Sequence, residues 1–263
     1  MSLTQRQQHI KDEFTQLHGV WDDAWEDILR LDPEFLASYL QFSAVPWRKN
    51  HLDDRVKELI YLAVDANATH MYGPGVRQHI QAALKLGATK QELMEVLELS
   101  ATLSIHVFST GLPILMQVLE ERGMRTEAAP RTEAQERVKA EFSKSRGYWS
   151  PFWDDLLDLD PELFAAYTNF SAHPWRHGTL EPKIKEFIYI AFDATATHLY
   201  EQGLKVHIEN ALGYGATAHE ILEVMEIASA LGMHAVNSAA PILAELAELS
   251  EQPAGPAQVS QTH

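Results

Sequence analysis

Apolar residues along the chain recur at the three- and four-residue spacing of amphipathic helices. In the stretch DDRVKELIYLAVDANATH (53–70), one such stripe holds Val56, Leu59, Ile60 and Ala63. No stretch alternates apolar and polar residues in the manner of a half-buried β-strand. The pattern therefore predicts an all-α protein.

Capping residues indicate where several of these helices begin and end. Asp32-Pro33 is typical of a helix start, because Asp accepts hydrogen bonds from free backbone amides and Pro suits the first turn. Thr89 to Glu92 and Thr217 to Glu220 each have the spacing of a capping box. Gly87 suits the left-handed position that ends a helix. A last helix of the first half is expected over about 104–121.

The chain repeats itself at an offset of 128 residues. Trp21 aligns with Trp149, and the alignment continues without a gap from Thr4 onto Thr132 to Pro113 onto Pro241. Roughly half of the aligned residues are identical, and the unit is too long for a solenoid repeat. We therefore predict two tandem helical domains, 1–128 and 129–250. The Pro/Gly/Gln-rich tail, 251–263, is expected to be disordered.

Composition excludes several classes of function. The chain has 263 residues, of which 46% are hydrophobic, with 21 Lys and Arg against 37 Asp and Glu and a net charge of −16. Such acidity disfavours nucleic acid and acidic membrane surfaces as partners. Cysteine is absent, which excludes disulfides and thiol catalysis. No signal peptide is recognisable and no run approaches the ~18 apolar residues of a membrane helix, so we expect a cytoplasmic protein.

One motif occurs in both halves and contains candidate chemistry. ATHMYGPGVRQH (68–79) and ATHLYEQGLKVH (196–207) share Thr-His-x-Tyr-x-x-Gly-x-x-x-His. Histidine suits proton transfer near neutral pH, a carboxylate can fix its tautomer, and a tyrosine hydroxyl can stabilise an enolate oxygen. The candidate catalytic residues are Glu58, His70, Tyr72, His79, Glu186, His198, Tyr200 and His207.

The stretch from the second motif histidine onward resembles the carboxymuconolactone decarboxylase and alkyl hydroperoxidase D-like family. The matching positions are His79, Gly87, Thr89, Glu92, Glu95 and Val96, and again His207, Gly215, Thr217, Glu220, Glu223 and Val224. The resemblance covers about half of the chain and implies the all-α fold of that family in two copies. It also implies a decarboxylase-like lyase, or a hydrolase, that acts without a cofactor on a small organic acid or lactone, and a homo-oligomer of two or three chains.

The chain departs from the hydroperoxidase members at their Cys-x-x-Cys pair. Counting back from His79, those positions hold Tyr72 and Gly75, so thiol peroxidase chemistry is disfavoured. The spacing from Glu58 to His79 is also about two residues longer than in the family, which leaves His70 as a second candidate for the first cysteine position. Arg48/Arg176 and Lys57/Lys185 are the paired basic candidates for holding a product carboxylate.

Other interpretations of these residues stay open. The glutamate, both motif histidines and the tyrosine can be structural, His106 is expected to cap or pack a helix, and Asp65 is expected to be solvated. The tryptophans are expected to anchor a core or interface. A histidine and glutamate metal site is a third possibility, although His70 and His79 are out of phase on a continuous helix. A protein that kept the fold for binding or assembly, without catalysis, is the main alternative.

Overall fold

The computed structural model describes residues 2–126 and 129–251, and within these ranges it contains α-helices, two 3₁₀ segments and no strand. The prediction of an all-α protein is confirmed. The described chain forms two compact units, one built from 1–51 and 229 onward (unit 1) and the other from 52–228 (unit 2). The predicted tail, 251–263, lies almost wholly outside the described residues.

Unit 1 combines the beginning and the end of the chain. Its helices are α1 (Gln5–His18), α2 (Asp23–Leu31), α3 (Pro33–Ser43), α4 (Val45–Lys49), the 3₁₀ turn η2 (Ala230–Gly232) and α15 (Met233–Glu251). Phe14 and Trp25 pack in its core with tilted rings whose centroids are 4.3 Å apart. Met233 and Ala240 of α15 complete that core against α1, α2 and α3, so the last helix of the second repeat covers the first helices of the first repeat.

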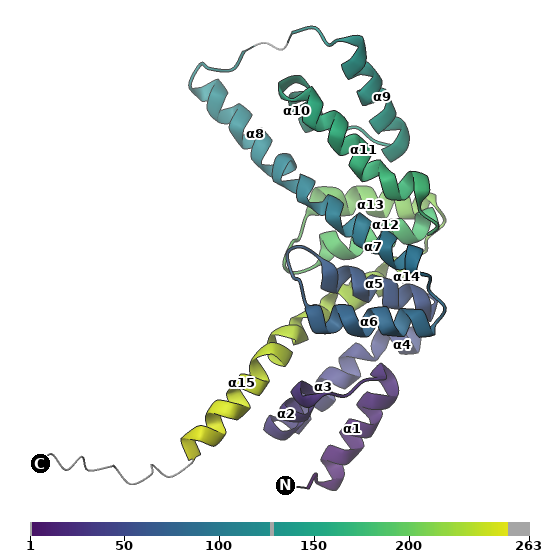
Figure 1. The fold of residues 1–263 in the computed structure, drawn as a ribbon, viewed down its shortest axis with the longest axis vertical. Coiled ribbons are helices and arrows are strands. Elements are labelled where there is room, and N and C mark those ends of the chain that lie inside the picture. The colour runs from purple at the N-terminus through teal and green to yellow at the C-terminus, as the bar shows by residue number, and fades with distance from the viewer. Residues whose placement is uncertain (1, 127–128, 252–263) are drawn as a thin grey trace, which may run out of the picture. The chain divides into compact units, whose positions relative to one another are not determined.

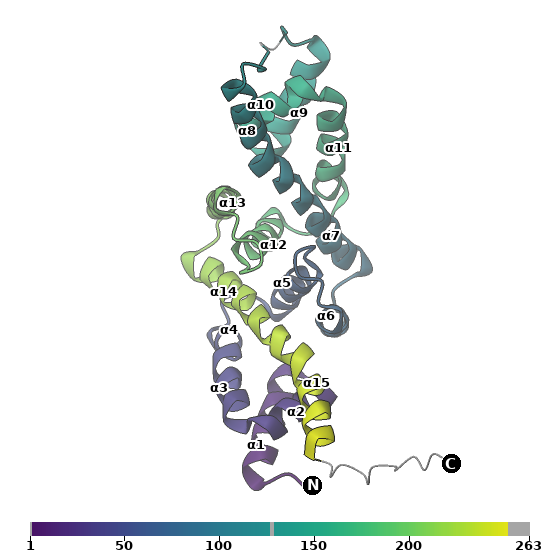
Figure 2. The ribbon, with the colours of Figure 1, turned by 90° about the vertical axis from the view of Figure 1, so that its left-hand side faces the viewer.

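Unit 2 holds the remaining helices (Figure 1; Figure 2). These are α5 (Asp54–Ala66), α6 (Gly73–Lys85), α7 (Lys90–Ala101), η1 (Thr102–Ile105), α8 (His106–Glu121), α9 (Glu133–Arg146), α10 (Phe152–Leu159), α11 (Pro161–His177), α12 (Pro182–Ala194), α13 (Glu201–Gly213) and α14 (Ala218–Ser229). The equivalent helices α5 and α12 pack side by side at its centre. Both are buried on all sides, because ten consecutive residues of each, 56–65 and 184–193, are buried.

Unit 2 contains the converse arrangement, in which the last helix of the first repeat covers the first helices of the second. Leu112 and Met116 of α8, from the first repeat, pack against Phe142, Trp153 and Phe164 of α9, α10 and α11, from the second. At the offset of 128, Leu112 corresponds to Ala240 of α15. Each set of tryptophan-containing helices is therefore completed by the last helix of the other repeat, and sequence repeats and compact units do not coincide.

Local capping follows the sequence signals. The side chain of Thr89 accepts from Glu92 N while Glu92 Oε2 accepts from Thr89 N, and Thr217 and Glu220 do the same. Asp32 caps α3 in front of Pro33. Gly87 has φ +89°, the left-handed value expected after a helix end. These predictions are confirmed because they depend only on neighbouring residues.

Buried ion pairs connect the two repeats within unit 2. Lys185 Nζ lies 2.8 Å from Glu95 Oε1, and Glu95 Oε2 also accepts hydrogen bonds from the backbone amides of Thr179 and Leu180. Lys57 Nζ lies 3.7 Å from Glu223 Oε1, the equivalent pair. Both lysines are buried, so these interactions hold the repeats in register rather than binding a substrate.

Two continuous helical stretches are long and apolar enough to cross a membrane by length and composition alone, Lys90–Glu121 and Ala218–Ala247. The sequence predicted no such stretch, because no uninterrupted apolar run approaches about 18 residues. In the first, Leu112 and Met116 of α8 pack in the core described above, and 39% of the apolar window is buried within the protein.

Candidate active site

The shared motif forms a tight turn between α12 and α13. Thr195 leaves the helix with ψ 142°, and Leu199 takes the left-handed φ of 47°, which is uncommon for a residue with a branched side chain. The turn closes when Tyr200 N donates to Asp193 O at 2.9 Å. Met71, with φ 54°, and the bond from Tyr72 N to Asp65 O repeat this turn after α5. The motif thus brings its histidine and tyrosine back beside the buried aspartate that ends the preceding helix.

A histidine–glutamate pair lies across α12 and α13. His207 Nδ1 is 2.6 Å from Glu186 Oε2, and Asn210 Nδ2 donates to the other carboxylate oxygen at 3.2 Å. The ring of Tyr189 stacks on the imidazole with centroids 4.5 Å apart. The glutamate is only 2% exposed. A buried carboxylate on Nδ1 fixes the imidazole's orientation and leaves Nε2 for chemistry.

The first repeat contains the same pair between α5 and α6. His79 Nδ1 lies 2.7 Å from Glu58 Oε2, and Tyr61 stacks on the imidazole with centroids 4.7 Å apart. Both members of the pair are buried. The repeat therefore reproduces the hydrogen bond and the aromatic support together.

A buried aspartate lies next to each pair. His79 Nε2 is 3.6 Å from Asp65 Oδ2, and His207 Nε2 is 4.0 Å from Asp193 Oδ2. The expectation of a solvated Asp65 is wrong, because its exposure is 0%. Burial raises the pKa of each aspartate to about 7, although the neighbouring histidine opposes this and the nearby glutamate adds to it. The burial of Asp65 was not predicted, because the polar residues of α5 have the spacing of a solvent-facing stripe, whereas the helix is in fact buried on all sides.

The other motif histidine of the second repeat meets the start of α8. His106 Nδ1 lies 2.7 Å from His198 Nε2, and Asp193 Oδ1 lies 3.9 Å from both of these nitrogens. Burial, together with His198 and His207, lowers the pKa of His106 to about 3, and burial also lowers that of His198. Both imidazoles are therefore neutral at pH 7, the state that can ligate a metal. His106 was expected only to cap or pack a helix, but its side chain also contacts His198.

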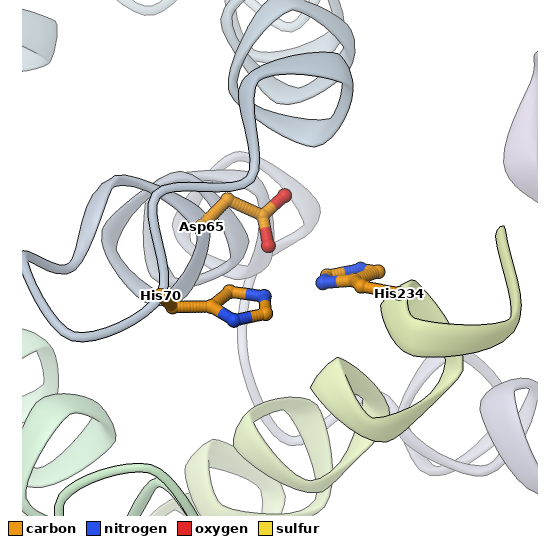
Figure 3. A group of neighbouring side chains, drawn as sticks. All are labelled: Asp65, His70 and His234. Atoms are coloured by element: carbon orange, nitrogen blue, oxygen red, sulfur yellow. The ribbon is translucent and has the colours of Figure 1, made fainter. Parts of the chain in front are cut away.

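The first repeat holds equivalents of these residues. Asp65 lies at the end of α5 and His70 in the turn that follows (Figure 3), and both side chains point into the same space. Burial lowers the pKa of His70, as it does for His198. The third residue drawn, His234, belongs to unit 1. His70 does not join the Glu58–His79 hydrogen bond.

A cavity of about 290 Å³ opens beside the second pair, between α8–α11 and α12–α13. His106, Tyr189, Tyr200 and His207 form part of its wall. Trp149, between α9 and α10, and Trp175, in α11, also line it. No Asp or Glu lines this cavity among the residues that the structure describes. A largely aromatic cavity of this size suits a small ligand.

Arg146, at the end of α9, supplies the cation in this wall. It makes no ion pair within the described part of the chain. Burial alone would lower the pKa of its guanidinium, but Tyr189, Tyr167 and Tyr148 together raise it, so the group stays charged. A comparison of the two repeats does not reveal Arg146, because His18 occupies the equivalent position in the first repeat.

The paired basic residues proposed from the sequence make ion pairs and hydrogen bonds outside the cavity. Lys57 and Lys185 form the buried ion pairs described above. Arg176 bonds to Glu141 and Asn169 on the surface, and Arg48 donates to Gln41 O. None of the four lines the cavity.

The two candidate tyrosines have different surroundings. Tyr200 lines the cavity, and its ring lies 3.9 Å from that of His106. Burial raises its pKa, so its hydroxyl remains a proton donor above neutral pH. Tyr72 lies beside His70, with ring centroids 6.0 Å apart. The expected role of the tryptophans as anchors agrees with Trp25 and Trp153, which are core residues.

Comparison with known proteins gives two matches. The model of the carboxymuconolactone decarboxylase family matches residues 33–105 and again 161–245. A crystal structure from Burkholderia xenovorans, described as a "putative gamma-carboxymuconolactone decarboxylase subunit", is 52% identical and has a TM-score of 0.89. That match covers 93% of this chain and 98% of the other. No protein with a curated description matches the chain.

Proposed function

Because the chain belongs to the carboxymuconolactone decarboxylase family, as the sequence resemblance indicated, we propose that unit 2 is an acid–base lyase that decarboxylates a small organic acid or lactone. One observation carries the proposal. The imidazole of His207, held by Glu186, and the guanidinium of Arg146 line the same cavity, which contains no carboxylate in its described wall.

The histidine performs the proton transfer. Loss of CO₂ leaves an electron pair that moves onto an adjacent carbonyl as an enolate, and a proton must then be added at carbon. His207 can deliver that proton from Nε2, because Glu186 holds Nδ1 and stabilises the imidazolium form. Protein side chains alone supply this step, and the proton is replaced from water.

In the proposed reaction, the two ends of the substrate occupy different positions in the cavity. Arg146 binds the carboxylate that remains on the product, since a guanidinium matches a carboxylate with two parallel hydrogen bonds. The leaving carboxylate lies against another aromatic ring of the wall, such as that of Phe152. An apolar wall disfavours the charged carboxylate relative to neutral CO₂, which assists the reaction.

Tyrosine hydroxyls stabilise the enolate oxygen. Tyr200 and Tyr189 both line the cavity, and burial keeps the Tyr200 hydroxyl protonated. A neutral donor directed at a developing negative charge lowers the barrier without a prior proton transfer. The cavity supports catalysis over a pure assembly role, because an assembly protein needs no space for a ligand beside this pair.

Turnover of a panel of lactones, lactone acids and β-keto acids tests the proposal, with CO₂ release and ring opening measured separately. Wild type should release CO₂ from at least one carboxylated substrate, and His207→Ala together with His79→Ala should lose that activity. Equal rates in wild type and the double variant would refute the proposal. Ring opening without CO₂ would replace it with a hydrolase.

A further inference from the structure

Three metal-ligating side chains converge beside the cavity. We propose that His106, Asp193 and His198 bind a divalent transition-metal ion of the zinc class. They come from the start of α8, the end of α12 and the turn that follows α12, so tertiary packing brings them together. The proposal does not depend on the lyase activity.

The positions of the three donor atoms fit one ion. His106 Nδ1 and His198 Nε2 are 2.7 Å apart, and Asp193 Oδ1 lies 3.9 Å from each. The point equidistant from these three atoms is about 2.1 Å from each of them, which agrees with the roughly 2.0–2.2 Å of zinc–nitrogen and zinc–oxygen bonds. The donor atoms are therefore close enough for one ion, and a tetrahedral arrangement requires the two imidazole nitrogens to separate to about 3.4 Å.

The carboxylate at this position is short of partners. Asp193 is 1% exposed, and its Oδ2 accepts no hydrogen bond among the described residues. The basic side chains with a nitrogen within 4.0 Å of its oxygens are the imidazoles of His106, His198 and His207, and no Lys or Arg forms an ion pair with it in the described chain. A buried carboxylate without a fixed cation is costly, and a bound metal ion would supply the missing charge.

A glycine in α13 leaves room for the carboxylate of Asp193. A Cβ at Gly203, in the first turn of α13, would lie 2.2 Å from Asp193 Oδ2. Only glycine lets the helix approach so closely. Gly75 stands in the same relation to Asp65 in the first repeat, with 1.8 Å for the added Cβ. In each repeat, therefore, a glycine lets the helix backbone approach the buried aspartate closely.

The donor set indicates the kind of ion. Two imidazole nitrogens and one carboxylate oxygen suit zinc, iron(II) or manganese, whereas magnesium and calcium prefer oxygen alone. Three protein ligands leave at least one coordination position for water or a ligand. Each of the three residues has an identical residue at the offset of 128, namely Asp65, His70 and His234.

The competing explanation is a direct hydrogen bond between the two imidazoles, one donating N–H to the other's lone pair. A Zn²⁺ titration of EDTA-stripped full-length protein, followed by calorimetry and by the visible spectrum of a Co²⁺ substitute, separates the two. Wild type should bind Zn²⁺, and His106→Gln, His198→Gln and Asp193→Asn should each lose one equivalent. His173→Gln, which replaces a surface histidine of α11, should bind as wild type does.

Wild type that binds no Zn²⁺, or a His198→Gln variant that keeps every equivalent, would overturn the proposal. Circular dichroism of the stripped variants shows whether each one folds. If the buried Asp193→Asn does not, the more exposed His198 decides the question. Glu186→Gln should retain all Zn²⁺ while losing turnover, so failure of this site and failure of the lyase are distinguishable.

Discussion

His207 Nδ1 lies 2.6 Å from Glu186 Oε2, the ring of Tyr189 stacks on the imidazole, and both rings line the cavity. We predict that Glu186→Gln lowers kcat of decarboxylation by about 10²–10⁴, because the amide cannot stabilise an imidazolium as a carboxylate does. Steady-state kinetics measures this. The isosteric amide should leave the melting temperature close to that of wild type. Unchanged kcat would remove His207 from the chemistry.

Arg146→Gln should raise KM for carboxylated substrates about tenfold or more, since a charge-assisted bond contributes about 1.5–3 kcal/mol. Kd from quenching of tryptophan fluorescence provides a second readout, because Trp149 and Trp175 share the cavity wall. Arg176→Gln is the matched control, since that arginine bonds to Glu141 and Asn169 outside the cavity. Equal effects of the two variants would contradict the assignment.

Glu95→Gln should destabilise the protein by about 3–5 kcal/mol, because it leaves the buried Lys185 without its counter-charge. The double variant Glu95→Gln/Lys185→Met should recover part of that loss. Chemical denaturation of the four proteins in a double-mutant cycle measures the coupling. Additive effects would show that the pair does not hold the repeats in register.

Stability should depend on pH through Asp193. Burial raises its folded-state pKa to about 7, above the ordinary value of an aspartate in the unfolded chain. The folded protein therefore binds more protons between about pH 4 and 7, and the free energy of unfolding of EDTA-stripped protein should fall as pH rises through this window. Asp193→Asn should make the free energy of unfolding depend less steeply on pH in this window. Asp12→Asn, at an exposed position, should leave that dependence unchanged.

An apolar face on α8 predicts self-association. Ile114, Leu115 and Val118 are 39–57% exposed, and α15 exposes Ile242, Leu243 and Leu246 at the same repeat positions. Exposed apolar side chains repeated in this way favour a symmetric contact with a second copy of the chain. Leu115→Lys should lower the mass measured by light scattering after gel filtration. A wild type that is monomeric at every concentration would refute this.

The all-α class, the repeat and the caps followed from the sequence because each depends on residues close together in the chain. Helical spacing, Thr89 with Glu92 and Gly87 act within one or two turns. The family motif likewise indicated Glu58 with His79 and Glu186 with His207, because both pairs recur at one spacing.

Only the tertiary structure showed what lies around those pairs. Arg146 enters the cavity because α8 of the first repeat closes the tryptophan-containing helices of the second, and Asp193 meets His106 across the same exchange. Such contacts join residues that are tens of positions apart. They depend on which helix faces pack together, and each helix by itself leaves that choice open.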